Sequence, residues 1–280
     1  MYIKKPYKGV YHNAKTKYYP DSSFKLTCAS QPVFKEPGWE CDETYVKLPK
    51  PKDMTNTPRN DSARRAKEKI FDIVKLNHFE WYVTLTLNSS VVNRYDVVEI
   101  RKVIHSFFSN AVQRKNASYV VVPELHKDGA IHLHGFLSGA FSFVLSDTVK
   151  HKACKKPIKI STAKRYKYDL SECKPVYNIK DWRYGFSTAI KLDDDSSKTR
   201  IAKYTTKYIT KDLSKIFGSF YFAGGKDLTR VAPFFVFDLN YDNCDYQSKS
   251  FCAETGVEYK YFDSDKFVPE VTDDDFFNVF

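Results

Sequence analysis

The amino-acid sequence predicts an α+β fold in which a central antiparallel sheet is flanked by helices, with irregular extensions at both ends. Three observations indicate it: a hairpin signal at Asp128-Gly129, strand-like residues over Trp81–Leu87, and apolar residues at helical spacing over Tyr95–Gln113. Asp-Gly is a strong hairpin signal because glycine accepts a positive φ without steric cost. A further helix is expected over Ala63–Leu76, after a group of good N-cap residues.

The two arms of the predicted hairpin are Tyr119–Leu125 and Ile131–Leu137. On a strand, alternate side chains share a face. His132 and His134 therefore project the same way, and Leu133 between them points to the core. Two imidazoles on one face of a strand are candidate ligands for a metal ion or partners for a substrate.

The length of the hairpin loop decides what lies opposite the two histidines. A three-residue loop places Glu124 and His126 on their face, whereas a two-residue loop presents Leu125 and Pro123. In the first case two imidazoles and a carboxylate form an open site of nitrogen and oxygen ligands. Such a site suits Mg²⁺ or Mn²⁺, which keep coordination positions free for substrate oxygens.

A second polar constellation lies downstream, in the helix predicted over Ala202–Leu213. Tyr204, Lys207, Tyr208 and Lys211 fall at positions i, i+3, i+4 and i+7. One face of this helix therefore carries two phenols and two ammonium groups.

Three motifs in this order give the chain a resemblance to the HUH (His-hydrophobe-His) endonuclease superfamily, specifically to rolling-circle replication initiators of small bacteriophages and plasmids. They are Thr84-Leu85-Thr86 at the end of a strand, His132-Leu133-His134, and Tyr204-x-x-Lys207-Tyr208. The resemblance runs from about Ser62 to about Asn240. It implies a metal-dependent endonuclease with a palm-like sheet that nicks single-stranded origin DNA.

The resemblance also implies roles for individual residues. An acidic residue eight positions before the first histidine is a familiar third metal ligand in the superfamily, which favours Glu124 beside His132 and His134, with His126 as second choice. Tyr204 or Tyr208 attacks the phosphate to give a 5′-phosphotyrosine and a 3′-OH that a host polymerase extends, and the strand is later religated. The alternatives are a transposase, a relaxase, or an origin-binding protein without catalysis.

Lys207 or Lys211 is expected to support this chemistry electrostatically. A tyrosine ordinarily has a pKa near ~10, and a neighbouring ammonium favours its phenolate. Both lysines lie one helical turn or less from a candidate nucleophile, Tyr204 or Tyr208.

The charge of the chain is strongly asymmetric. The net charge is +11, but residues 241–280 contain ten acids and three lysines, or −7, which leaves +18 on residues 1–240. A basic body fits a polyanion-binding protein, and an aromatic content of 16% provides surfaces on which bases can stack. No apolar run approaches the ~18 residues of a membrane span. We expect a cytoplasmic protein of a bacterial host.

The expected domain organisation has three parts. Residues 1–61 form an N-terminal extension and linker, residues 62–240 the endonuclease domain with an irregular lysine-rich insertion at 138–180, and residues 241–280 an acidic tail. The chain has no Gly-x-x-x-x-Gly-Lys-Ser/Thr helicase motif. Unwinding then requires a host helicase, and the acidic segment Thr272–Phe280 is a candidate for recruiting it.

Overall fold

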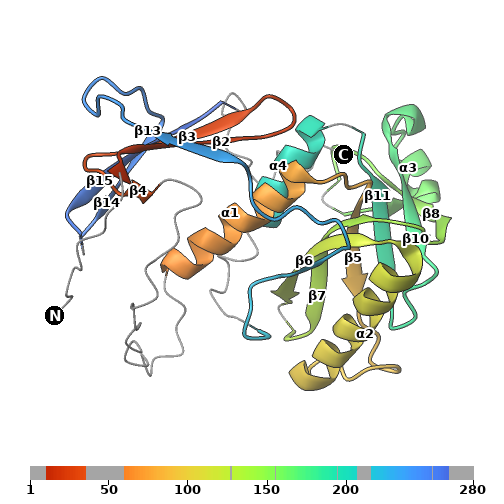
Figure 1. Ribbon diagram of the computed structural model, residues 1–280. Coiled ribbons are helices and arrows are strands. Elements are labelled where there is room, and N and C mark those ends of the chain that lie inside the picture. The colour runs from red at the N-terminus through yellow and green to blue at the C-terminus, as the bar shows by residue number, and fades with distance from the viewer. Residues whose placement is uncertain are drawn as a thin grey trace. The chain divides into compact units, whose positions relative to one another are not determined.

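The computed structural model describes residues 11–35, 60–126, 128–154, 156–193, 195–206, 216–253 and 255–264. The chain divides into two compact units, Met1–Thr55 with Ala232–Pro269 and Asn56–Val231 with Glu270–Phe280. Figure 1 shows helices and antiparallel sheets in these parts, so the predicted α+β class is confirmed. Within the described ranges, no helix has the length and apolar character needed to cross a membrane.

The larger unit is built on an eight-stranded sheet in the order β12-β6-β7-β5-β11-β10-β8-β9, and every neighbouring pair is antiparallel. Its strands are β5 (Trp81–Thr86), β6 (Ser118–Leu125), β7 (Ile131–Ser138), β8 (Phe143–Lys150), β9 (Ile158–Lys159), β10 (Lys174–Ile179), β11 (Ser187–Lys191) and β12 (Phe222–Gly224). Its helices are α1 (Asn60–Leu76), α2 (Val97–Lys115), α3 (Ile160–Arg165) and α4 (Asp195–Thr205), with a 3₁₀ turn at Leu170–Glu172.

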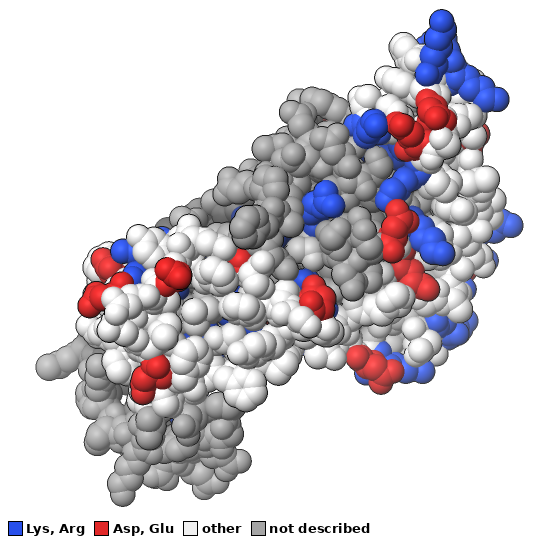
Figure 2. All heavy atoms as spheres, turned by 90° about the horizontal axis from the view of Figure 1, so that it is seen from above, with Lys and Arg blue, Asp and Glu red and all other residues white. Residues whose placement is uncertain are grey.

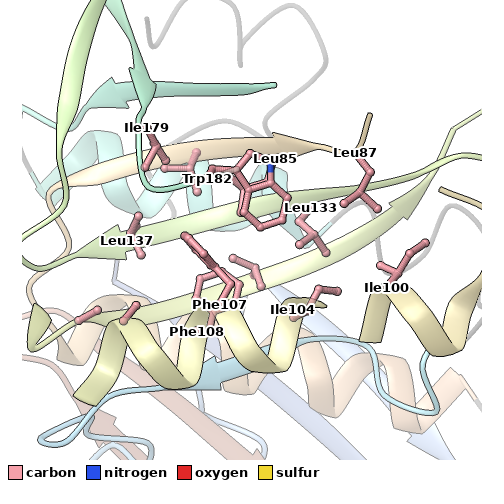
Figure 3. Packing of buried hydrophobic residues seen from close by; sticks show 14 of the residues in the cluster. Leu85, Leu87, Ile100, Ile104, Phe107, Phe108, Leu133, Leu137, Ile179 and Trp182 are labelled. Atoms are coloured by element: carbon pink, nitrogen blue, oxygen red, sulfur yellow. The ribbon is translucent and has the colours of Figure 1, made fainter. Parts of the chain in front are cut away.

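Helix α2 packs against one face of this sheet and forms the main hydrophobic core (Figure 3). Ile100, Ile104 and Phe108 of the helix are fully buried against Leu85 of β5 and Leu133 of β7. Burying a side chain of this size stabilises the fold by about 1.5–3 kcal/mol. Leu85 and Leu133 are register partners, so this core fixes which faces of β5 and β7 remain for polar residues.

The opposite face of the sheet is partly covered by α1 and α4, which pack against each other. The α1 residues expected to be apolar, Ala66, Ile70 and Val74, are buried. Helix α1 contacts β6 and helix α4 contacts β7. The polar side chains that project from this face therefore lie on the same side of the sheet as α4.

The prediction of an irregular insertion over residues 138–180 was wrong. The segment contains β8 and β10, which pair with each other, and β10 also pairs with β11 inside the sheet. The lysines around these strands hid their alternation, in which buried Val176 and Ile179 are separated by half-exposed positions. Helix α4 also begins earlier than expected, at Asp195 within the predicted turn at Lys191–Lys198.

The smaller unit contains a five-stranded antiparallel sheet in the order β13-β2-β3-β15-β14. Its strands are β2 (Ala14–Tyr18), β3 (Phe24–Ala29), β13 (Phe234–Phe237), β14 (Ser248–Cys252) and β15 (Val257–Asp263), and β1 (Tyr11–His12) pairs separately with β4 (Phe34–Lys35). Parts of the expected N-terminal extension and acidic tail thus belong to one sheet. Pairing over such separations leaves no local trace in a sequence.

Candidate metal and tyrosine site

The hairpin β6–β7 has the register of a three-residue loop. Glu124 lies directly opposite His132, and the His126 N–H donates to the Ala130 carbonyl oxygen at 2.8 Å. Gly129 in the loop has a φ of 83°, the left-handed conformation that glycine adopts without strain. Of the two registers left open by the sequence, the structure therefore has the one that places a carboxylate on the face of the two histidines.

His134 is held on both sides by hydrogen bonds. Thr84 Oγ1 lies 3.1 Å from its Nδ1, and Glu124 Oε2 lies 2.9 Å from its Nε2. An ionised carboxylate only accepts, so Nε2 carries the proton and Nδ1 accepts from the threonine hydroxyl. The side chains of His134 and Glu124 are 12% and 13% exposed, so both groups are largely shielded yet reachable from solvent.

His132 is the register partner of both Glu124 and Thr86. Burial lowers the pKa of its imidazole, and the neighbouring His134 and His126 lower this pKa further. The ring is therefore neutral at neutral pH, which is the form that binds metal ions. The rings of His132 and His134 are 6.4 Å apart between centroids.

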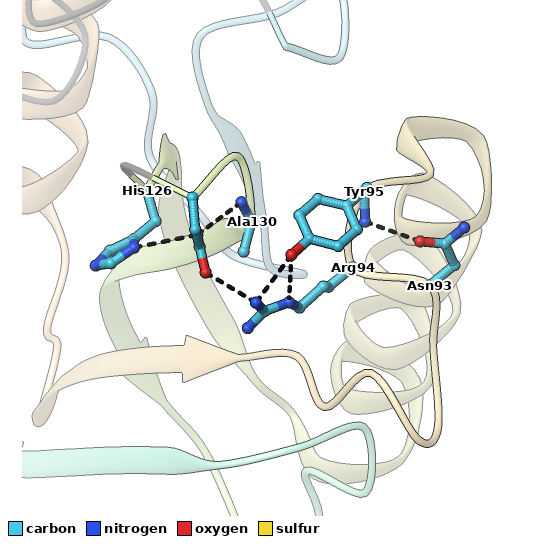
Figure 4. A network of polar contacts seen from close by, with 6 residues as sticks. Asn93, Arg94, Tyr95, His126 and Ala130 are labelled. Atoms are coloured by element: carbon cyan, nitrogen blue, oxygen red, sulfur yellow. Dashed lines mark hydrogen bonds and ion pairs between the residues drawn. The ribbon is translucent and has the colours of Figure 1, made fainter.

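His126 is engaged at the tip of the hairpin (Figure 4). Its Nδ1 lies 3.1 Å from Asp128, and its ring stacks on His132 with a centroid distance of 5.1 Å. Arg94 donates to Asp128 at 2.8 Å and to the Tyr95 hydroxyl at 2.9 Å. The backbone N–H of Ala130, followed by His126 and Arg94, holds the pKa of Asp128 below its usual value. The network anchors the hairpin tip to the segment between β5 and α2.

Tyr204 lies partly exposed in the last turn of α4, the helix that contacts β7. Its environment is revealed by Tyr82 of β5, which shares a sheet face with Thr84. Burial raises the pKa of the Tyr82 phenol; a hydrogen bond with Thr205 opposes this shift, and the charges of Tyr204 and Glu124 add to it. Tyr204 and Glu124 thus both lie within electrostatic reach of one buried phenol. The remaining predicted residues of this helix, Lys207, Tyr208 and Lys211, lie outside the described residues.

The predicted ligand set can be tested against the chemistry of a divalent ion. Neighbouring ligands of an octahedral Mg²⁺ at 2.0–2.1 Å lie about 3 Å apart. Glu124 Oε2 and His134 Nε2, which are 2.9 Å apart, match that separation. Among the described residues, no three His, Cys, Asp or Glu side chains are grouped closely enough to hold a metal ion as they stand. The pair fits two neighbouring ligand positions, and His132 lies across the strand from Glu124.

The positive charge is not gathered into one continuous field on the face seen in Figure 2. Lys and Arg side chains collect at one end of that view, and Asp and Glu lie among them. The site residues themselves include one carboxylate and two imidazoles. The charge that attracts a polyanion to this chain is therefore distributed over several surfaces.

Sequence reasoning missed two residues beside the site. Tyr82 stands two positions before Thr84, and the alternation of β5 was sufficient to place both on one face. Arg94 carries no comparable signal, because its contact with Asp128 joins two loops that only the folded chain brings together.

Comparison with known proteins gives one family. Residues 80–213 match the family model for replication-associated proteins of the ORF2 type. The match contains β5, the β6–β7 hairpin and α4, and with them every candidate site residue. It supports a replication-initiator family for this chain. No curated protein and no solved structure matches the chain.

Proposed function

We propose that this chain is a rolling-circle replication initiator that nicks single-stranded origin DNA through a tyrosine attack and later religates it. The observation that carries the proposal is the convergence on one sheet face of the Thr84–His134–Glu124 hydrogen bonds and Tyr204, within the segment that matches the replication-associated family. Each of these residues stands in one of the three motifs or pairs with one.

Glu124, His132 and His134 are the residues that would hold a Mg²⁺ or Mn²⁺ ion. When bound, such an ion neutralises a non-bridging oxygen of the scissile phosphate. The chain's own contribution is orientation. Thr84 fixes the ring of His134 at Nδ1, and the pairing of Glu124 with His132 places its carboxylate on the same face. Such supporting contacts typically change metal affinity or activity by about 10–100-fold.

The chemical step forms one bond and breaks another. The phenol oxygen of Tyr204 or Tyr208 attacks the phosphorus, and the bond from phosphorus to the 3′ oxygen breaks. The phenolic proton leaves the nucleophile, and the 3′ oxygen takes up a proton to become a 3′-OH. Lys207 or Lys211 balances the phenolate charge. The phosphotyrosine conserves the bond, so attack by a 3′-OH reverses the step and reseals the strand.

The proposal includes partners. The new 3′-OH serves a host polymerase, and a host helicase supplies unwinding in the cytoplasm of a bacterial host. The acidic segment Thr272–Phe280, which lies outside the described residues, is the proposed recruiting element for the helicase.

The test is formation of a covalent adduct. Purified protein is incubated with Mn²⁺ and 3′-labelled single-stranded oligonucleotides that tile the replicon carrying the gene, and the products are separated on a denaturing gel. The label should move with the protein on one tile, because the 5′ phosphate of the downstream fragment is linked to tyrosine. The adduct should disappear with EDTA and in the double variant Tyr204→Phe/Tyr208→Phe.

The matched control is Tyr177→Phe, the same change in β10, which lies three strands from β7 in the sheet order. It should form the adduct normally. Binding of one tile without any adduct, in the wild type and all variants alike, would support a non-catalytic origin-binding protein instead.

A further inference from the structure

The five-stranded sheet of the smaller unit has two chemically different faces. Strand register places Lys17 beside Lys25 and Phe234, and Lys15 in the row of Thr27 and Tyr261. Tyr259 follows on the same face of β15. We call the surface formed by Lys15, Lys17, Lys25, Phe234, Tyr259 and Tyr261 the lysine–tyrosine face. All six side chains are partly exposed.

The opposite face is the packed side of this sheet. Ala14, Cys28 and Lys260 form one row across it, and all three are buried. The Lys260 ammonium donates to the carbonyl oxygens of Tyr241, Asp242 and Cys244 at 2.5, 3.3 and 3.3 Å, which fastens the loop before β14 over this side. The core of the sheet therefore lies here, and the lysine–tyrosine face does not supply it.

The lysine–tyrosine face carries an excess of positive charge among its strand residues. Three lysines stand there with the carboxylate of Asp263, which lies 3.9 Å from the Lys25 ammonium. The ammonium of Lys15 lies 4.0 Å from the centroid of the Phe234 ring. Lys15 and Lys17 stand two residues apart on β2, so they point the same way along the strand.

Aromatic rings lie beside these charges. Tyr259 and Tyr261 have nearly parallel rings, with centroids 6.4 Å apart and planes inclined by 20°. Ser250 of the neighbouring strand lies 2.9 Å from the Tyr261 hydroxyl and so orients that ring. A row of lysines next to rings held in parallel combines backbone charge neutralisation with surfaces for base stacking.

We propose that the lysine–tyrosine face binds single-stranded DNA without sequence preference, as a second contact besides the nuclease site. The choice of DNA over RNA rests on the proposed function; the choice of an unpaired polynucleotide rests on this face. Stacking on tyrosine needs bases that are not already stacked in a duplex. Protein interfaces, by contrast, are depleted in lysine. The lysines contact phosphates, and the rings of Tyr259 and Tyr261 contact bases.

The test measures binding of the full chain to a fluorescently labelled oligothymidylate at several salt concentrations. For single strands, log K falls with log salt by about 0.7 for each phosphate that is neutralised. Lys15→Gln/Lys17→Gln should therefore weaken binding at low salt and reduce this slope by about 1.4. Lys15→Arg/Lys17→Arg keeps the charges and should retain the wild-type slope. An unchanged slope in the glutamine variant would overturn the proposal.

The stacking part is tested at Tyr259. Tyr259→Leu should weaken oligothymidylate binding about tenfold or more, whereas Tyr259→Phe, which keeps the ring, should bind as the wild type does. Equal loss in both variants, or equally strong and equally lysine-dependent binding of a duplex, would refute a single-strand stacking surface. Lys249→Gln, on the opposite face of the sheet, should leave the salt slope unchanged.

The result can be separated from the fate of the nuclease proposal. Cleavage of a short origin oligonucleotide reports the Tyr204 site, and the salt slope with oligothymidylate reports the lysine–tyrosine face. If the lysines matter and no cleavage occurs, this inference stands and the proposed function fails. If cleavage occurs and the slope is unchanged in Lys15→Gln/Lys17→Gln, the reverse holds.

Discussion

Replacing Thr84 by valine should loosen His134 without changing the shape of the site. Valine has nearly the volume of threonine but lacks the hydroxyl that lies 3.1 Å from His134 Nδ1. The change leaves the ring bonded through Nε2 to Glu124, at 2.9 Å. The Nδ1 atom then lies in a largely buried side chain without the threonine partner.

The size of the effect follows from that burial. An ordinary hydrogen bond contributes about 0.5–1.5 kcal/mol, and a buried group left without its partner costs about 1–3 kcal/mol. His134 is 12% exposed, so water replaces the hydroxyl only in part. We expect Thr84→Val to lower the free energy of unfolding by about 1–2 kcal/mol. We also expect it to weaken Mn²⁺ binding by about 10–100-fold, as for other supporting contacts of ligand histidines.

Urea unfolding measures the first quantity, and calorimetric titration with Mn²⁺ measures the second. Thr86→Val is the matched control, since it makes the same change on the same strand and sheet face, and Thr86 has no side-chain hydrogen bond to His132 in the described part of the chain. The control should bind Mn²⁺ nearly as the wild type does. Equal Mn²⁺ affinity in wild type and Thr84→Val would refute the role assigned to the hydroxyl.

Two further changes test the packing and the electrostatics of the larger unit. Gly135→Ala should cost about 3 kcal/mol or more in urea unfolding, because a Cβ there would lie 2.0 Å from the Val120 carbonyl oxygen and 2.7 Å from Val121 Cα, both rigid backbone; a cost below about 1 kcal/mol would contradict this. Burial lowers the pKa of Lys150 to about 8 from 10.5. Between these values the unfolded chain binds more protons, so the stability of the wild type relative to Lys150→Met should rise with pH from about 8 to 10.5. A flat difference between their urea-unfolding free energies over that range would exclude a buried, depressed lysine.

The parts of the fold that could be predicted are those with short-range causes. The Asp128-Gly129 pair indicated the hairpin, and Gly129 indeed adopts a positive φ. The spacing of Ile100, Ile104 and Phe108 indicated α2, whose N-cap Asp96 accepts the N–H groups of the first turn. These signals are written within a few residues of one another, so they survive without knowledge of the tertiary structure.

The parts that could not be predicted depend on distant pairings. β3 and β15 are neighbours in the sheet of the smaller unit, although more than two hundred residues separate them. Only the pairing shows that Lys25 and Tyr261 share a face, and with it a surface. The same limit applies to the site: the sequence provided Thr84, Glu124 and His134 as candidates, but the bonds that order them depend on the strand register.

The most direct test of the central claim is to identify the residue that carries the DNA. The covalent adduct is digested with nuclease and trypsin, and the peptide bearing the residual nucleotide is sequenced by mass spectrometry. We expect a 5′-phosphorylated nucleotide on Tyr204 or Tyr208, with none formed by His134→Gln. A nucleotide on any other residue, or an adduct that forms equally well in His134→Gln, would contradict the account.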